Sequence, residues 1–246
     1  ERVSTVRTKT ELEYAIDIKN VLDIYGYTAD DVSGGIVCSV VPQITNVMRV
    51  ATEKILRREI MVVKPGLKTG LNILMDFPNQ LGSDLVAGAV AGITHYQVPL
   101  IIFDLGTATT VCVVDDKKNY IGGMIYPGLR VSLDALTSNA SQLQGVGLES
   151  PERVIGKNTI DCMKSGILNS NAAAIDGIID RIEEELGKKA TVLATGGLAK
   201  TVVPLCRREI ILDEELLLKG MLTLYQKNRT AYAALAETGK GANPCG

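Results

Sequence analysis

The stretch that most constrains the fold is a polar turn between two apolar segments. Residues 99–103 are apolar and predict a buried strand, and residues 109–114 are rich in β-branched side chains and predict the next strand. Between them, Asp104, Gly106 and Thr107 supply a carboxylate, a flexible backbone position and a hydroxyl. Such a turn can hold a phosphate chain on backbone N–H groups, with the aspartate facing the cation that accompanies a nucleotide. A plain hairpin, whose polar side chains satisfy only the turn, explains the pattern equally well.

The composition predicts a packed α/β protein. Of the 246 residues, 46% are hydrophobic but only 4% are aromatic, so the core must be aliphatic, which suits helices layered on a sheet. The net charge of -2 and the lack of a long basic run give no support for nucleic acid or an anionic membrane as a partner. The longest apolar region, residues 86–103, is interrupted by His95, Gln97 and Pro99 and is a poor membrane span.

The cysteines argue for a cytoplasmic location and against a zinc site. There are five of them with one histidine, and no two cysteines form a CxxC pair. An odd number of scattered thiols fits a reducing compartment better than a disulfide framework.

The order of predicted elements favours two lobes, over residues 1–97 and 98–246. In the first lobe we expect helices and short strands, with a capping box at residues 10–13 and a long loop at 65–80. In the second, three successive strands should form an antiparallel meander, which a fourth strand at 190–195 extends in parallel. The expected helices are at 10–26, 82–96, 129–139, 159–186, 198–205 and 213–227, with one more that begins at Pro42 and carries Ile55 on its apolar face. The expected strands are at 35–41, 59–63, 100–103, 109–114, 120–125, 190–195 and 209–212, and a fraying tail runs from 228 to 246.

A second glycine turn, Gly196-Gly197, follows the strand at 190–195 and precedes a helix. Glycines in that position allow a nucleotide to lie on the helix N-terminus, although a tight connecting turn is the commoner explanation. The pairing of the two turns matters more than either one. We therefore predict that Asp104 and Thr107 lie opposite Gly196 and Gly197, where the turns could hold the two ends of one nucleotide.

Two further residues begin predicted helices, and each has two interpretations. Asp84, in the run Gly82-Ser83-Asp84, could cap its helix or accept a proton from a substrate hydroxyl. Thr159 could likewise cap its helix or bind a ligand.

Taken in order, these segments resemble type III pantothenate kinases. Six segments of the chain match motifs of that family. Residues 65–71 match its pantothenate segment PGxKTGL, residues 82–85 its GADR motif, and residues 104–110 its phosphate loop DFGTATT. Residues 122–128 match GGxIxPG, residues 156–159 match GKNT, and residues 194–199 match its adenosine turn. The resemblance runs from about residue 2 to residue 227. An ordered set of this kind is far more specific than any single motif.

The resemblance implies a two-lobed, actin-like (ribonuclease H-like) kinase fold of mixed sheets flanked by helices, with ATP in the cleft, working as a homodimer. It implies phosphorylation of pantothenate to 4′-phosphopantothenate, the first step of coenzyme A biosynthesis, with Mg²⁺ accompanying ATP. Position by position, it makes Asp84 the general base and Asp104 the ligand of a monovalent cation, K⁺ or NH₄⁺. It places pantothenate at Gly82, Ser83, Leu85 and Thr159, and ATP at Gly106, Thr107, Gly196 and Gly197.

Three departures from the family pattern leave alternatives open. The family's first strand and its DxGNT phosphate loop have no counterpart before residues 1–5, so either they lie outside this sequence or the protein lacks half of its phosphate-binding clamp. Leu85 stands where the family has an arginine that meets pantothenate, and Val6 stands where it has an aspartate. Besides a pantothenate kinase, a diverged kinase of another hydroxyl compound and a non-catalytic regulatory paralogue fit these departures.

Overall fold

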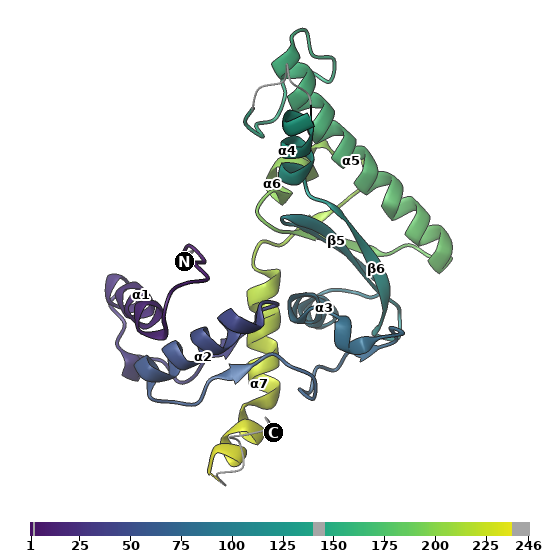
Figure 1. Ribbon diagram of the computed structural model, residues 1–246. Coiled ribbons are helices and arrows are strands. Elements are labelled where there is room, and N and C mark those ends of the chain that lie inside the picture. Colours follow the sequence, from purple (N-terminus) through teal and green to yellow (C-terminus); the bar gives the residue numbers. More distant parts are fainter. Residues whose placement is uncertain (2, 140–145, 238–246) are drawn as a thin grey trace. The chain divides into compact units, whose positions relative to one another are not determined.

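The computed structural model describes residues 1, 3–139 and 146–237 (Figure 1). These residues group into two compact units, each assembled from segments that are distant in the chain. Of the described residues, the first unit takes those within 1–69, 79–90 and 217–237, and the second takes those within 70–78 and 91–216. The lobe boundary expected at residues 97–98 stays a prediction.

The second unit is built on a six-stranded mixed sheet in the order β3-β6-β5-β4-β7-β8. As predicted, β4, β5 and β6 form an antiparallel meander, and β7 pairs with the free edge of β4 in parallel. β3 and β8 each add a short parallel strand at one side. The strands are β3 (Asn72–Ile73), β4 (Leu100–Leu105), β5 (Ala108–Val114), β6 (Asn119–Pro127), β7 (Thr191–Thr195) and β8 (Ile211–Leu212).

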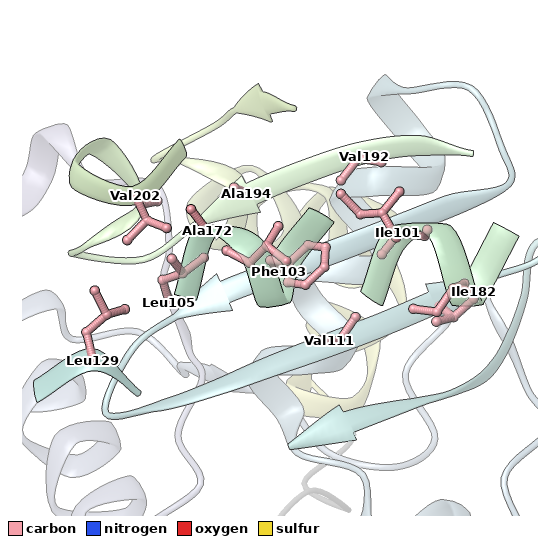
Figure 2. Packing of buried hydrophobic residues seen from close by; sticks show 14 of the residues in the cluster. Ile101, Phe103, Leu105, Val111, Leu129, Ala172, Ile182, Val192, Ala194 and Val202 are labelled. Atoms are coloured by element: carbon pink, nitrogen blue, oxygen red, sulfur yellow. The ribbon is translucent and has the colours of Figure 1, made fainter. Parts of the chain in front are cut away.

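One face of this sheet forms a core cluster against helix α5 (Thr159–Leu186), as Figure 2 shows. Alternate residues of β4 (Ile101, Phe103 and Leu105) belong to this cluster, as the two-residue period of a strand requires. Burying each such side chain stabilises the fold by about 1.5–3 kcal/mol. Helix α5 contributes a stripe at three- and four-residue spacing: Leu168, Ala172, Ile175, Ile179 and Ile182.

The residues of β4 that point the other way meet the end of helix α3 (Ser83–His95). A Cβ added to Gly92 would lie 2.8 Å from Leu100 Cδ1 and 3.0 Å from Ile102 Cδ1. The small residues of this helix therefore pack closely, as the sequence predicts, and a side chain at position 92 would push α3 away from the sheet.

The first unit is mainly helical. Helix α1 (Glu11–Ile24), which begins with the predicted capping box, packs against α2 (Pro42–Leu56) around Tyr14 and Ala51. Two short strands, β1 (Ile36–Val37) and β2 (Met61–Val62), pair in parallel.

Helix α7 (Leu216–Glu237) also packs in the first unit, against α3. A Cβ at Gly220 would lie 1.9 Å from the carbonyl oxygen of Ala87, so only a glycine allows the two backbones to come this close.

Several predicted boundaries are wrong. The strands expected at 35–41, 59–63 and 209–212 are each only two residues long. Residues 65–80 include β3 and a 3-10 turn (Pro78–Gln80), because a two-residue strand depends on its partner β6 and leaves little local pattern. The helix expected at 198–205 is a single turn, α6 (Ala199–Val202), followed by a 3-10 turn that contains Pro204. Helix α7 continues to Glu237, past the residue where fraying was expected, and residues 238–246 of that tail lie outside the described residues. Helix α4 (Leu129–Asn139) has its predicted bounds.

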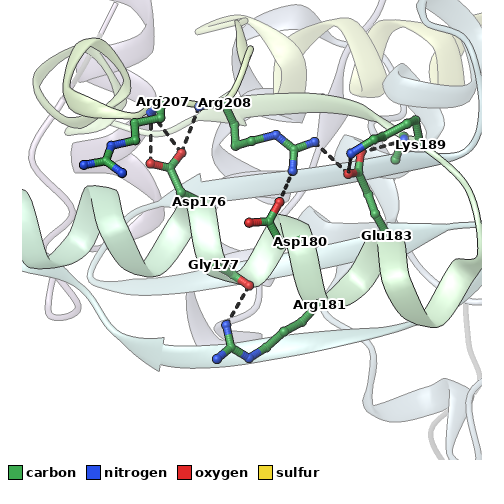
Figure 3. A network of polar contacts seen from close by, with 9 residues as sticks. Asp176, Gly177, Asp180, Arg181, Glu183, Lys189, Arg207 and Arg208 are labelled. Carbon is green, nitrogen blue, oxygen red and sulfur yellow. Dashed lines mark hydrogen bonds and ion pairs between the residues drawn. The ribbon is translucent and has the colours of Figure 1, made fainter.

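A polar network fastens the segment around β7 to helix α5 (Figure 3). The Glu183 carboxylate, only 5% exposed, accepts hydrogen bonds from Lys189 Nζ (2.7 Å), Arg208 Nη2 (2.7 Å) and the backbone N–H of Ala190 (3.1 Å). Burial alone would raise the pKa of Glu183, but these hydrogen bonds outweigh it and hold that pKa below its ordinary value of 4.5. On the same helix, Asp176 accepts the backbone N–H of Arg208 (3.0 Å).

We expect Glu183→Gln to lower the free energy of unfolding at neutral pH by about 2 kcal/mol, because charge-assisted hydrogen bonds are the stronger kind. The folded-state pKa of Glu183 is lowered, so its contribution is present above pH 4.5 and is lost as the pH falls through that lowered pKa. The two proteins should therefore converge in acid. Urea denaturation at neutral pH and at about pH 3 measures this.

Asp180→Asn is the matched control, since this exposed carboxylate pairs with the same Arg208. We expect it to change the free energy of unfolding by less than about 1 kcal/mol. A Glu183→Gln deficit that is equal at both pH values would contradict the assignment.

Candidate functional site

Two turns of the second unit follow the C-terminal ends of neighbouring strands, so they lie at the same end of the sheet. The strands that lead into them, β4 and β7, are parallel, and Asp104 pairs in register with Thr195. The turn at Gly106-Thr107 and the turn at Gly196 therefore lie side by side, as the sequence analysis expects.

The contact between these turns is made by backbone. Gly196 has a φ of +95°, and a Cβ there would lie 2.5 Å from Asp104 Oδ1 and 2.7 Å from the backbone nitrogen of Leu105. Only glycine accepts both that conformation and that proximity. The helix that follows, α6, is a single turn, which agrees with the tight connecting turn that the sequence analysis gives as the commoner explanation.

A third segment closes on the first turn. Gly128 donates its N–H to the Thr107 carbonyl (3.1 Å), and a Cβ at Gly128 would lie 2.4 Å from that oxygen and 2.5 Å from the Gly106 carbonyl. The carbonyl groups of the turn thus face Gly128, while the Thr107 residue is exposed. This leaves a backbone cradle with an accessible hydroxyl at its rim.

The chemistry of this cradle suits a cation that prefers oxygen ligands. The position of a Cβ on Gly106 would be 3.4 Å from the Ala108 carbonyl oxygen and 3.7 Å from Asp104 Oδ1, so the two oxygens border the same space. Hard cations bind carboxylate, carbonyl and hydroxyl oxygens. Within residues 1, 3–139 and 146–237, no three His, Cys, Asp or Glu residues group as metal ligands.

In the first unit, Asp84 lies in the first turn of α3. The N–H of Val86 donates to the Gly82 carbonyl (3.1 Å), so Gly82 precedes the helix and Asp84 is its second residue rather than its N-cap. Asp84 Oδ1 accepts the N–H of Leu85 (2.9 Å) and lies 2.4 Å from where a Gly82 Cβ would be. The glycine therefore makes room for the carboxylate.

The hydroxyl of Ser83 ties this helix start to the segment after β1. Ser83 Oγ donates to the carbonyl of Ser39 (3.1 Å), and Cys38 Sγ lies 3.5 Å from Ser83 Oγ. Burial raises the pKa of the Cys38 thiol, so this cysteine stays protonated beside Asp84 at neutral pH. Ser83 thus fixes the position of the neighbouring Asp84.

Thr159 begins helix α5 but does not cap it. The N-cap is Asn158, whose side chain accepts the N–H of Asp161 (2.9 Å), so the exposed Thr159 is not needed for capping. Gly156 packs against this first turn, with its Cβ position 2.5 Å from the Cys162 nitrogen. A polar hollow of about 500 Å³, lined among others by Lys157 and Lys164, adjoins this helix start.

Sequence reasoning missed one residue that bears on these segments. The sequence analysis places Asn228 in a fraying tail, yet it is buried at 4% exposure inside α7 and binds the backbone of Lys68. The available signal was the four-residue spacing from Leu216 through Leu224 to Asn228, which continues one face of the helix past residue 227.

The chain is similar to proteins of one family. A family model described as type III pantothenate kinase matches residues 1–181. A type III pantothenate kinase from Bacillus cytotoxicus is 43% identical over 227 residues, which cover 92% of this chain and 87% of that protein.

Among solved structures, a Baf family transcriptional activator from Campylobacter jejuni aligns with a TM-score of 0.51 and 18% identity, over 70% of this chain and 74% of that one. This likeness concerns the fold alone. Acetate kinase from Entamoeba histolytica aligns over 92% of this chain and 87% of its own, with a TM-score of 0.47 and 9% identity. Among the described residues, no helix is both long enough and apolar enough to cross a membrane.

The two glycine turns generate a stability prediction. We expect Gly196→Ala to cost clearly more free energy of unfolding than Gly187→Ala. Both glycines have a left-handed φ (+95° and +66°), which costs an alanine about 1–2 kcal/mol, but a Cβ at Gly187 meets nothing within 4 Å. Urea denaturation of both variants isolates the contact with Asp104 and Leu105. Equal losses would show that the two turns are not in contact.

Proposed function

The chain belongs to the type III pantothenate kinase family, and from this premise we propose which of its residues carry out the family's reaction. The protein is an ATP-dependent kinase with an α/β, actin-like fold. It transfers phosphate to the hydroxyl of pantothenate to give 4′-phosphopantothenate, the first step of coenzyme A biosynthesis.

We assign the general base to Asp84. A primary hydroxyl is a weak nucleophile, and its proton must leave as the bond to phosphorus forms. A carboxylate within hydrogen-bond reach of that hydroxyl can accept the proton. The observation that supports Asp84 is its place: it is not needed as the N-cap, Gly82 leaves room for its carboxylate, and Ser83 anchors the turn that carries it.

We assign the nucleotide to the turns of the second unit. We expect ATP to contact Gly106, Thr107, Gly196 and Gly197. Their backbones lie at the ends of the neighbouring strands β4 and β7, and Thr107 is exposed. Asp104 would hold a monovalent cation, K⁺ or NH₄⁺, together with neighbouring backbone oxygens. Mg²⁺ bound to ATP would neutralise charge on the phosphate groups. The residues of the chain then act mainly by positioning the reactants.

We assign pantothenate contacts to Gly82, just before α3, to Ser83 and Leu85 in the first turn of α3, and to Thr159 at the start of α5. Thr159 is exposed and free of a capping role, which supports this assignment. Leu85 cannot provide the charge-assisted hydrogen bond of the arginine expected there, so other hydroxyl compounds should be assayed beside pantothenate. We also propose that the reaction takes place in the cytoplasm.

We expect Asp84→Asn to lower kcat for pantothenate by roughly a hundredfold or more, the usual scale of general-base catalysis. The amide keeps the size of the side chain and can still accept the Leu85 N–H, so the melting temperature should change little. Steady-state kinetics with the full chain, beside a thermal melt, measures both effects.

Asp23→Asn, which neutralises an exposed carboxylate on α1, is the control and should leave kcat unchanged. If Asp84→Asn turns over pantothenate as fast as the unaltered protein, Asp84 is not the base.

We further propose that the protein is a homodimer whose interface includes the start of α5. Three aliphatic side chains there are strongly exposed, Val154 at 71%, Ile155 at 81% and Ile160 at 53%. An apolar cluster of this kind commonly marks an association surface.

A dimer mass is expected at micromolar concentration, and Ile155→Asp should shift it toward the monomer, because a buried unpaired charge opposes association. Light scattering after size exclusion measures the mass. Ile24→Asp changes an equally exposed residue (78%) outside the proposed interface and should leave the dimer intact. A monomeric unaltered protein would refute the dimer.

A further inference from the structure

We propose that Asn228 is a positioning residue that holds residues 64–69, here called the anchored loop, in the shape that binds pantothenate. The inference rests on the proposed function, pantothenate phosphorylation, and on one step beyond it: that the PGLKTGL segment, which resembles the family's pantothenate segment and starts in this loop, meets the substrate. The hydrogen bonds that restrain the loop lie within the first unit, to which both α7 and the loop belong.

The anchored loop has little structure of its own. It contains no helix or strand, and most of its residues are exposed. Gly66 adopts a left-handed φ of +98°, and the backbone hydrogen bond from Leu67 N–H to the Lys64 carbonyl is long, at 3.5 Å. A loop of this kind would sample many conformations unless other parts of the protein restrained it.

Helix α7 supplies the restraint. Asn228 Oδ1 accepts the Lys68 N–H (2.8 Å), and Asn228 Nδ2 donates to the Lys68 carbonyl (3.0 Å) and to the Leu224 carbonyl (2.8 Å). Both amide hydrogens and the amide oxygen are therefore used. One side chain pairs with both backbone groups of a single residue, much as a neighbouring strand would.

The neighbouring residue strengthens the hold. Lys227 Nζ donates to the Thr69 carbonyl (2.8 Å), so two consecutive residues of α7 bind two consecutive residues of the loop. The side chain of Lys68 is left outside this arrangement, and the residue is exposed. The loop is thus held by its backbone at Lys68 and Thr69, while the exposed side chain of Lys68 points out of this arrangement.

These contacts predict an effect on substrate binding rather than on chemistry. Without Asn228, the binding-competent loop would be a minor conformer, and the apparent affinity falls in proportion to its population. Each hydrogen bond to the loop is worth on the order of 1 kcal/mol, so the two together correspond to a rise in KM of about tenfold or more. The groups that transfer phosphate are not touched, so kcat should change less than about threefold.

The experiment compares Asn228→Ala with Asn171→Ala in the full chain. Asn171 is the matched control: it too is buried in a long helix (8% exposed), and its Nδ2 donates to the carbonyl four residues earlier (2.9 Å), but this hydrogen bond stays within its own helix. Three quantities are measured, the melting temperature, the rate of tryptic cleavage after Lys68, and KM and kcat for pantothenate. We expect both variants to lose stability, and only Asn228→Ala to be cut faster after Lys68 and to show the raised KM.

A second variant tests the inference even if Asn228→Ala does not fold. Lys227→Met removes the contact to Thr69 from an exposed position, so the fold should survive, and KM should rise about two- to fivefold with kcat unchanged. Two outcomes overturn the inference: cleavage after Lys68 at the same rate in Asn228→Ala and Asn171→Ala, or faster cleavage with an unchanged KM. If the unaltered protein phosphorylates no candidate substrate, the proposed function fails, while the cleavage comparison still tests the hold on the loop.

Discussion

The close backbone contact between β4 and the residue after β7 is the constraint on which the arrangement of the candidate site depends. Gly196 can lie against Asp104 and Leu105 only because it has no side chain and adopts a left-handed conformation. That contact requires the parallel register of β4 and β7, which in turn requires α5 to cover the sheet. The aliphatic core therefore does more than stabilise the unit, since it sets where two polar turns meet.

A second theme is that long helices supply polar side chains to the backbone of irregular segments. Glu183 and Asp176 on α5 accept N–H groups of Ala190 and Arg208, and Asn228 on α7 pairs with Lys68. Backbone groups in loops lack the partners that a helix or sheet provides, so they need water or side chains. A rigid helix is a good place for such a side chain, because its own position is already determined.

Much of the second unit could be predicted from sequence, because its strands and the helix α5 carry strong local patterns. The runs at β4, β5 and β6 are apolar or β-branched, and α5 begins and ends at its predicted residues. What sequence could not give depends on tertiary partners. β3 is two residues long and exists through β6, and Asn158 rather than Thr159 caps α5, a choice that the local motif leaves open. At the site, the proximity of Asp104 and Gly196 could be predicted, because the sequence predicts that their two strands pair in parallel. The burial of Asn228 could not, because it depends on packing against a loop about 160 residues away in the chain.

The register of β4 with β7 also bears on the order in which the protein folds. β4, β5 and β6 are joined by short turns and can pair soon after they form, whereas β7 must return from about ninety residues further along the chain to pair with β4. Closing so long a loop costs entropy before any contact repays it, so the parallel pair should form late. A folding intermediate would then present a finished hairpin with the free edge of β4 exposed, and the nucleotide turns would be the last part of the sheet to come together. Such an edge can pair with another chain as readily as with β7, so the segment between the hairpin and β7 governs the aggregation risk of newly made protein.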